Sequence, residues 1–248
     1  MWSPAFLRNA QLSQKSRSPK PTSNRFLASL AANDLALLKP HLQPVVLKFR
    51  QRLEVARKPI LSAYFLDTGL ASVIANGGRD RQVEAIILGN EGFTGISLIL
   101  GVDRSPNETV MQAAGAGHSI SAGDLHNASE QSSVLRLRLL HFAHVALMQV
   151  SQTALANAQG KIEERLSRWL LMAHDRVETD AIMLTHEFLA LMLGVRRAGV
   201  TIALQELEAS ALISTSRGVV NVLDRVGLEI RANGFYGVPE KEYERLLN

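Results

Sequence analysis

The spacing of hydrophobic residues between positions 184 and 222 predicts two short helices and then a hairpin. From Phe188 to Leu193 the apolar residues recur three and four positions apart, which places them on one side of a helix. Gly194 follows, and glycine adopts the left-handed conformation that ends many helices without steric strain. A second helix is expected from about Arg196. Its buried side would consist of Val200, Ala203, Leu204 and Leu207.

Two short β-branched runs come next and predict the hairpin. They cover residues 212–215 and 219–222 and flank Ser216-Arg217-Gly218, a turn in which glycine can supply a positive φ. Thr185 stands before the first helix, where its hydroxyl can cap a free backbone N–H. A helix, a turn, a helix and a hairpin in this order form a winged helix-turn-helix. The segment alone also fits a helical hairpin that serves only packing, and this alternative stays open here.

The polar face of the second helix favours DNA reading over plain packing. It carries Arg196, Arg197, Thr201 and Gln205, and Arg217 stands at the hairpin tip. An arginine can donate two hydrogen bonds to guanine and a glutamine can pair with adenine, whereas the tip can reach a phosphate or the minor groove. Gly199 costs about 1 kcal/mol relative to alanine in a helix, which is tolerable where the backbone must approach DNA closely.

The longest helical pattern in the chain runs from Gln131 to Ala158, with no glycine or proline until Gly160. Residues that recur at three- and four-residue steps form one narrow seam, which is typical of a coiled coil. The seam comprises Leu137, Leu140, His141, His144, Leu147, Met148, Ser151 and Leu155. On the pattern alone this is either a core helix or a dimer helix. We expect Gln159-Gly160 to be the hinge between the two halves of the chain.

The pattern before this helix changes from helical to strand-like. Residues 1–23 are rich in Ser, Pro, Lys and Arg and hold no acid, which is typical of a disordered basic tail. Residues 24–38 have the spacing of one helix that ends before Pro40. From residue 45 to about 121, β-branched and alternating runs are divided by Gly and Pro at intervals of about ten residues. Such spacing predicts a small antiparallel barrel, with Gly77-Gly78 as a hairpin turn.

Residues 162–223 resemble the C-terminal half of the Crp/Fnr family of bacterial transcription regulators. The resemblance is carried by the stretches IEERLSRWLLMAHDRV from Ile162 and LTHEFLALMLGVRRAGVTIALQELEASALIS from Leu184. It implies an α+β chain with an N-terminal antiparallel β jelly-roll barrel of the cyclic-nucleotide-binding type, a long dimerisation helix and a C-terminal winged helix-turn-helix. The chain would then divide into a tail (1–23), a sensor barrel (24–127), a dimerisation helix with its hinge (128–160) and a DNA-binding domain (161–248).

The resemblance also implies DNA contacts residue by residue. Thr185 and His186 stand where the first helix touches phosphate in the family, and a histidine makes that contact pH-sensitive. Arg197 matches the arginine that reads bases. Ala198 replaces a glutamate that is common at the next position, and Ile202 stands where another arginine is common. We therefore expect an operator that differs from the best-known Crp and Fnr half-sites.

Arg104-Ser105 stands where cyclic-nucleotide-binding members of the family hold the cyclic phosphate. A cation and a hydroxyl beside backbone N–H groups suit a phosphate. The position that would hold the ribose with a carboxylate is Thr94, however, and Glu91 comes three residues too early. A cyclic nucleotide is thus less favoured as the effector than a different ligand or none, and Arg104 is expected to be an exposed turn residue.

Composition narrows the class of protein. With 46% hydrophobic and 20% charged residues the chain is typical of a soluble globular protein. No apolar run reaches the roughly 20 residues that span a bilayer, and the first 23 residues lack the apolar core of a secretory signal. Cysteine is absent, which excludes disulfides and Cys-ligated clusters. These features predict a cytoplasmic protein without a membrane partner.

Catalytic and metal-binding patterns are missing. His186-Glu187 is followed by Ala190 where a zinc protease has its second histidine, and neither a Walker-type loop nor a Gly-x-Ser-x-Gly motif occurs. His141 and His144 are three residues apart, but two ligands do not make a metal site. We expect neither enzyme activity nor a metal ion.

The charge distribution leaves one alternative to DNA binding. Residues 1–160 hold 16 Lys and Arg against 10 Asp and Glu, whereas residues 161–248 hold 11 against 13. The acidic balance of the second half argues against non-specific electrostatic binding, but a specific reader needs only a few well-placed arginines. The sequence predicts a homodimeric regulator that binds promoter DNA sequence-specifically, with RNA polymerase left open as a further partner. The alternative is a signalling adaptor whose barrel acts through protein contacts.

Overall fold

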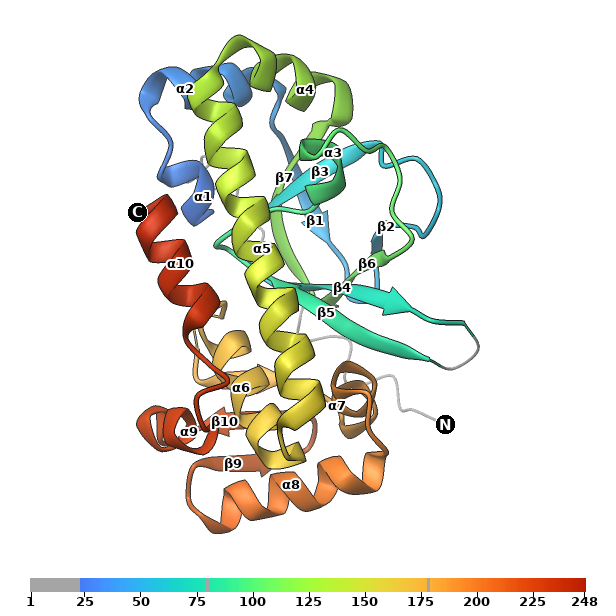
Figure 1. Cartoon of the computed structure of the whole chain (residues 1–248), viewed down its shortest axis with the longest axis vertical. Coiled ribbons are helices and arrows are strands. Elements are labelled where there is room, and N and C mark those ends of the chain that lie inside the picture. The colour runs from blue at the N-terminus through green and yellow to red at the C-terminus, as the bar shows by residue number, and fades with distance from the viewer. Residues whose placement is uncertain (1–22, 79–80, 178) are drawn as a thin grey trace, which may run out of the picture.

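The computed structural model describes residues 23–78, 81–177 and 179–248 (Figure 1). The basic tail predicted for residues 1–23 lies outside this part of the chain except for its last residue. A two-sheet domain occupies one end of the molecule, a small helical domain with its own sheet occupies the other, and the longest helix runs along both (Figure 1). The order of elements is the predicted one of sensor, long helix and winged helix-turn-helix.

The strands of the N-terminal domain form two antiparallel sheets, ordered β1-β7-β3 and β2-β6-β4-β5. This domain is called the sensor below, after the role that the sequence predicts for it. The strand bounds are Gln43–Leu47 (β1), Arg52–Glu54 (β2), Ser62–Leu66 (β3), Leu70–Asn76 (β4), Gln82–Leu88 (β5), Glu108–Ala113 (β6) and Gly115–Ser121 (β7). Residues of both sheets share one buried cluster, but within the described ranges no strand ladder joins the two sheets. The predicted jelly-roll architecture is therefore present as two packed sheets, and the barrel is not closed.

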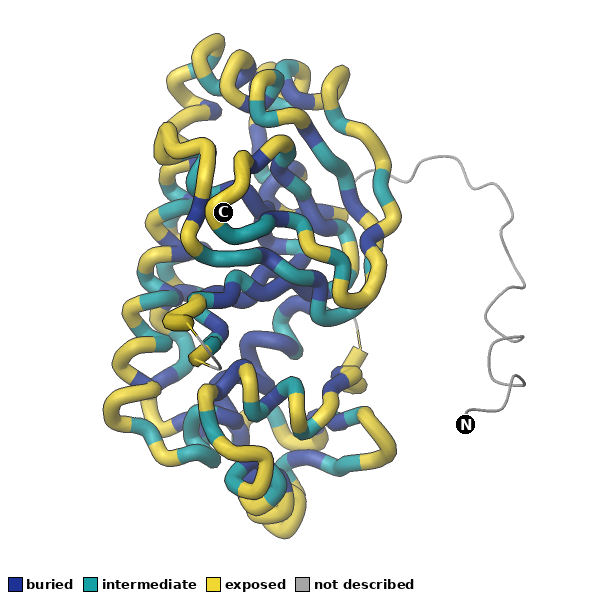
Figure 2. Tube along the Cα trace, turned by 90° about the vertical axis from the view of Figure 1, so that its right-hand side faces the viewer, coloured by how far each residue is buried: buried dark blue, intermediate teal, exposed yellow. Residues whose placement is uncertain are grey.

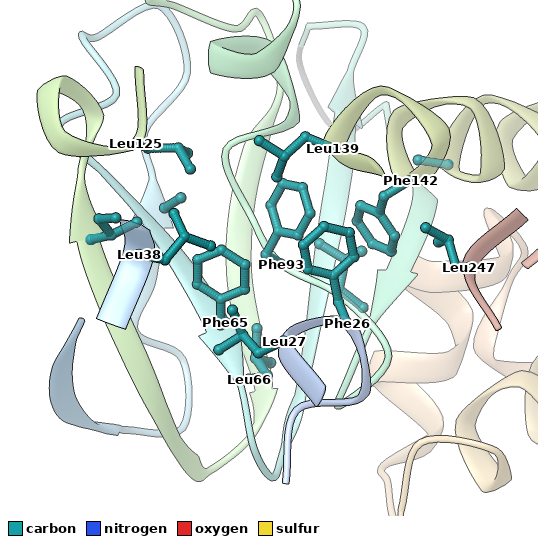
Figure 3. Packing of buried hydrophobic residues seen from close by; sticks show 14 of the residues in the cluster. Phe26, Leu27, Leu38, Phe65, Leu66, Phe93, Leu125, Leu139, Phe142 and Leu247 are labelled. Atoms are coloured by element: carbon teal, nitrogen blue, oxygen red, sulfur yellow. The ribbon is translucent and has the colours of Figure 1, made fainter. Parts of the chain in front are cut away.

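Four phenylalanines from distant parts of the chain meet between the sheets and the long helix (Figure 3). The ring centroids of Phe93 and Phe142 lie 4.6 Å apart, and those of Phe26 and Phe93 lie 5.0 Å apart. Phe65 of β3 completes the group, with its ring centroid 5.1 Å from that of Phe93. Aromatic pairs at these distances add to the stabilisation from buried apolar area. A Cβ at Gly92 would lie 1.9 Å from the Phe142 ring, so this close approach of helix and loop requires glycine.

Residues 24–38 form two helices rather than the single helix predicted. The bounds are Arg25–Ala28 (α1) and Ala32–Leu38 (α2), followed by the 3-10 turn Lys39–His41 (η2). The buried Asn24 side chain accepts the Leu27 N–H at 3.0 Å and caps α1. Its amide nitrogen also donates to the carbonyls of Leu66 and Gly92, both at 2.7 Å. These hydrogen bonds attach α1 to the sensor independently of α2. The spacing of apolar residues could not predict them, because their partners lie far away in the sequence.

The long helix begins two residues later than predicted. The helices in this region are Ile96–Ile99 (α3), Ala122–Gln131 (α4) and Ser133–Gln159 (α5). Ser132 lies between α4 and α5 and is the N-cap of α5. Its hydroxyl accepts the Leu135 N–H at 3.1 Å and donates to the Asp34 carboxylate at 2.7 Å. Gly160 has an extended backbone conformation. The helix α5 therefore ends at the predicted Gln159-Gly160 position.

The C-terminal part is a winged helix-turn-helix with one strand more than predicted. Its elements are Ile162–His174 (α6), Ala181–Met183 (β8), His186–Leu193 (α7), Arg197–Ala209 (α8), Ile213–Ser216 (β9), Val219–Val222 (β10), Arg225–Arg231 (α9) and Val238–Leu247 (α10). The unpredicted β8 pairs with β10 in a sheet ordered β8-β10-β9. Three residues are too short a run to show alternation in the sequence. The final helix, α10, runs back along α5 toward the sensor (Figure 1).

The two parts of the chain share their cores. Leu70, Ile74 and Ile87 of the sensor belong to the buried cluster of the helix-turn-helix part. Conversely, Tyr243 and Leu247 of α10 belong to the buried cluster of the sensor. Buried segments accordingly run through both ends of the molecule (Figure 2). None of the helices in the described ranges combines the length and the hydropathy of a membrane span.

Candidate nucleic-acid interface

A cap at each end defines α7, the first helix of the predicted DNA-reading pair. The Thr185 hydroxyl accepts the Phe188 N–H at 3.1 Å. Gly194 ends the helix in the left-handed conformation, with a φ of 61°. Both caps are therefore those predicted from the sequence.

The second helix, α8, has the two faces that the sequence predicted. Its buried side consists of Val200, Ala203, Leu204 and Leu207. Arg196, Arg197 and Gln205 are exposed, and Thr201 is half-buried. Gly199 lies close to α6, because a Cβ there would stand 2.9 Å from Cδ1 of Ile162. The predicted close approach of its backbone to DNA stays a prediction.

The starts of α7 and α8 and the wing enclose a hollow of about 210 Å³. Thr185 and His186 line it from α7, and Arg197 lines it from α8. The wing adds Thr215 and Ser216, which the sequence analysis did not single out. The other residues predicted to contact DNA do not line the hollow: Arg196, Thr201, Gln205 and Arg217. The structure thus brings three predicted residues together and spreads the rest along α8 and the wing tip.

Side chains around the hollow are held by bonds that the sequence analysis missed. Arg197 Nη1 lies 3.2 Å from the Glu187 carboxylate, and both side chains are exposed. Such surface ion pairs contribute about 0–1 kcal/mol, so Arg197 can exchange this partner easily. His186 Nδ1 lies 3.0 Å from the Thr201 hydroxyl. This bond orients the imidazole between the two helices.

The wing is tied to the end of α8. The backbone N–H of Thr215 donates to the Glu208 carboxylate at 2.8 Å, and its hydroxyl does so at 3.1 Å. Gly218, with a φ of 75°, supplies the positive φ that the hairpin turn needs. The exposed Arg217 therefore lies at the tip of a hairpin that these hydrogen bonds hold in place relative to α8.

In the sensor, a cavity of about 150 Å³ lies at the predicted phosphate site. Ser105 lines this cavity, whereas Arg104 is exposed and pairs with Asp103 at 3.5 Å. Glu54, which the sequence analysis did not single out, also lines it and accepts the Gly95 N–H at 2.7 Å. Burial raises the pKa of the Glu54 carboxyl. Ser105 therefore faces this cavity and Arg104 does not, and the Glu54 carboxylate occupies the N–H at the start of α3.

The two neighbouring histidines of α5 contribute to packing. His144 Nε2 lies 3.5 Å from the Glu242 carboxylate of α10, and His141 is half-buried. Within the described ranges, no three His, Cys, Asp or Glu side chains are grouped so as to hold a metal ion. His144 thus links α10 to α5.

The predicted seam of α5 faces solvent. Leu137, Leu140, Leu147 and Leu155 are 52%, 38%, 57% and 40% exposed. The opposite side of the helix carries Leu135, Leu139, Phe142 and Val145 into the sensor core. The two alternatives left open by the sequence thus describe two sides of one helix, a core side and an exposed apolar side.

Two buried carboxylates join the sensor to the helix-turn-helix part. Glu84 of β5 accepts a hydrogen bond from Trp169 Nε1 at 2.7 Å, and Glu91 accepts one from Arg176 Nε at 2.7 Å. The Ser72 hydroxyl also donates to Glu84. Burial raises the pKa of Glu84 to about 7, although the bonds from Ser72 and Trp169 lower it. Neither pair was predicted from the sequence, because partners 85 positions apart leave no local signal.

Comparison with known families matches residues 164–231 to the Crp-like helix-turn-helix domain. No curated protein matches the chain in sequence. FixK2 from Bradyrhizobium japonicum is similar in structure, with 13% identity, a TM-score of 0.68, and coverage of 76% of this chain and 96% of that one. A putative Crp/Fnr regulator from Eubacterium rectale has 16% identity, a TM-score of 0.65, and coverage of 84% and 97%. The c-di-GMP-responsive regulator CLP from Xanthomonas campestris has 18% identity, a TM-score of 0.61, and coverage of 77% and 99%.

The family match covers one domain of the chain, whereas the structural similarities cover most of the chain. Residues 164–231 include α7, α8 and the wing, the elements that enclose the hollow. The structural similarity takes in at least 96% of each neighbour named above, so the shared fold extends well beyond the helix-turn-helix. Residues 164–231 therefore match a Crp-like helix-turn-helix domain, and the chain shares the fold of these three solved regulators.

Proposed function

We propose that this protein is a sequence-specific transcription regulator that binds promoter DNA as a homodimer. The observation that carries the proposal is the hollow between α7, α8 and the wing, which Thr185, His186 and Arg197 all line. A hydroxyl, an imidazole and a guanidinium group are the kinds of donors that bind phosphate oxygens and position a protein on DNA. In this arrangement Thr185 and His186 contact the backbone, and α8 lies in the major groove.

Base reading in this proposal falls to the exposed face of α8. Arg197, Thr201 and Gln205 follow one another at four-residue steps, with Arg196 just before them. Arg197 can donate two hydrogen bonds to a guanine, and Gln205 can pair with an adenine. Ile202 is exposed on the same helix, and it suits contact with a thymine methyl group. Arg217 at the wing tip reaches a flanking phosphate or the minor groove.

The exposed apolar seam of α5 supports the homodimer. Contiguous exposed apolar surface on a soluble protein commonly marks an interaction site, and a seam with this spacing suits a second copy of the same helix. Leu137, Leu140, Leu147 and Leu155 would then be buried against the same residues of the second copy. Dimerisation would set two α8 helices to read half-sites roughly 34 Å apart, one turn of the duplex.

In this proposal the sensor domain controls DNA binding in response to a signal. The protein would act in the cytoplasm, where promoter DNA is accessible. The buried contacts of Glu84 with Trp169 and of Glu91 with Arg176 connect the sensor to the helix-turn-helix part. A signal that moves the sensor sheet at β5 would therefore bear directly on the position of α6.

Fluorescence anisotropy of the full-length protein on a labelled duplex from its own upstream promoter tests the proposal. A scrambled duplex serves as competitor, and the titration is repeated over a salt series. We expect saturable binding that survives the competitor and weakens moderately as salt rises, because few phosphate contacts are involved. Equal affinity for both duplexes at every salt concentration would contradict sequence-specific reading and favour an adaptor that works through protein contacts.

A further inference from the structure

The sensor cavity of about 150 Å³ contains two positions that the family resemblance assigns to a cyclic nucleotide, because Thr94 and Ser105 both line it. Glu54 is the one residue with an ionisable side chain among the described residues around this cavity. The chemistry of the cavity toward a charged ligand therefore depends on a single carboxyl group.

An irregularity in β2 turns Glu54 toward the interior. Arg52 and Glu54 are two positions apart, and in a regular strand such residues point to the same side. The Arg52 side chain is 66% exposed, however, whereas Glu54 is buried. The pairing of β2 with β6 shifts register between these two residues, and a β-bulge of this kind redirects a side chain. The backbone of β2 thus places the carboxyl group in the cavity.

The Glu54 carboxylate already uses a donor that a phosphate would need. It accepts the Gly95 N–H at 2.7 Å, and Gly95 has a φ of 82°, a conformation that favours glycine. Burial raises the pKa of Glu54, hydrogen bonds lower it, and no cation among the described residues contributes. Arg104, the cation predicted to hold the phosphate, pairs with Asp103 instead. The carboxylate therefore lies in the cavity without a guanidinium group to balance its charge.

A phosphate group does not fit these surroundings. Its negative charge would lie beside a buried carboxylate, and like charges at close range repel strongly where water is excluded. The volume points the same way, because pockets for drug-sized ligands measure roughly 300–1,000 Å³, and this cavity measures about 150 Å³. Inorganic phosphate is small enough for such a space, so only its charge would keep it out.

We propose that Glu54 closes the sensor to cyclic nucleotides and other phosphate anions, because its carboxylate holds the place of the phosphate. The effector that the family resemblance implies and the residues of this cavity thus disagree. The inference refines the proposed function by removing one class of signal for the sensor. It concerns ligand binding alone, so its failure would leave the question of DNA binding unaffected.

Isothermal titration with cyclic AMP and with sodium phosphate tests the exclusion. Both titrations use the full-length Arg197→Ala variant, because Arg197 lines the hollow that would otherwise attract phosphate. Cyclic AMP is the complete ligand, and inorganic phosphate is the probe for which size is no obstacle. We expect no saturable binding of either compound at millimolar concentration. Saturable binding of either one would overturn the proposal.

Glu54→Ala, introduced into the same background, identifies the excluding group. The change removes the carboxylate and frees the Gly95 N–H, so we expect the affinity for inorganic phosphate to rise at least about tenfold. Glu54→Gln removes only the charge and keeps an amide oxygen for Gly95. It should show a smaller rise, and it takes the place of the alanine variant if that variant folds poorly.

Glu108→Gln is the matched control, because Glu108 lies on the neighbouring strand β6 and does not line the cavity. It should bind phosphate no better than the background variant. A thermal melt of each variant shows whether the fold persists. If a folded Glu54 variant binds phosphate no better than the Glu108→Gln variant, Glu54 is not the excluding group and the proposal is overturned.

Discussion

Trp169 and Glu84 meet across the junction of the two domains, with the indole nitrogen 2.7 Å from the carboxylate. Both residues are buried, one in the helix that supports the DNA-reading pair and the other in the sensor sheet. A hydrogen bond in such surroundings is stronger than in water, and an unpaired carboxylate there is unfavourable. A movement of α6 relative to β5 must therefore break this contact.

The pH dependence of stability should reflect Glu84. Burial raises its pKa from an ordinary value of 4.5 to about 7, so the folded protein holds this proton more tightly than the unfolded chain. The stabilisation is complete below about pH 4.5 and is lost as the pH rises through about 7. At 1.36 kcal/mol per pKa unit, Glu84 lowers the free energy of unfolding by about 3 kcal/mol over that range.

Glu84→Gln isolates this contribution, because the amide keeps an acceptor for Trp169 and does not titrate. Urea unfolding of both proteins at a series of pH values between about 5 and 8 should show the unaltered protein losing stability relative to the variant. If the difference between the two unfolding free energies stays constant over that range, Glu84 does not titrate as described.

Breaking the buried pair of Glu91 and Arg176 should destabilise the fold strongly. Arg176→Met leaves the Glu91 carboxylate buried without its cation, which costs about 3–5 kcal/mol in comparable pairs. Adding Glu91→Gln to that variant should recover part of the loss, since it removes the unpaired charge. Denaturant unfolding of the two single variants and the double variant measures the coupling.

The exposed pair of Arg245 and Glu242, at 2.7 Å on the surface, is the control for this experiment. Its removal should leave the unfolding free energy nearly unchanged, because ion pairs at the surface contribute little to stability. A loss of that small size on Arg176→Met would show that the buried pair does not join the two domains energetically.

Arg197→Ala should weaken sequence discrimination by about 1–3 kcal/mol while reducing non-specific binding only slightly. Anisotropy titrations of the promoter duplex and the scrambled duplex give the ratio of affinities. Arg52→Ala is a matched control, because Arg52 is also 66% exposed and also pairs with a glutamate, here Glu108. Discrimination as strong in the Arg197→Ala variant as in the Arg52→Ala variant would remove Arg197 from the reading face.

Leu147→Lys should convert the proposed dimer into a monomer without unfolding it. Leu147 is 57% exposed on the seam of α5, so a charge there is tolerated in one copy but would be buried opposite another lysine in the dimer. Sedimentation equilibrium gives the mass, and a thermal melt shows whether the fold persists. Leu61→Lys, which alters an exposed leucine away from α5, should leave the mass unchanged.

Several features followed from the sequence because they depend on neighbouring residues. Thr185 and Gly194 cap α7 through backbone conformation and hydrogen bonds within a single turn, so their roles are local. The same holds for the hairpin turn at Gly218. The seam of α5 was also predictable, because helical spacing places Leu137 and Leu147 on one side whatever the helix packs against.

Other features required the tertiary structure because they arise where distant segments meet. Asn24 divides the first helical region through bonds to Leu66 and Gly92, and the spacing of residues 24–38 contains no sign of them. The burial of Glu84 and the exposure of Arg104 depend in the same way on what packs beside them. Local patterns in the sequence were enough to predict the type of fold and the caps and faces of α7 and α8. Only the packing of distant segments decided which side chains line a common hollow and which carboxylates are buried, because burial and convergence are properties of the folded chain as a whole.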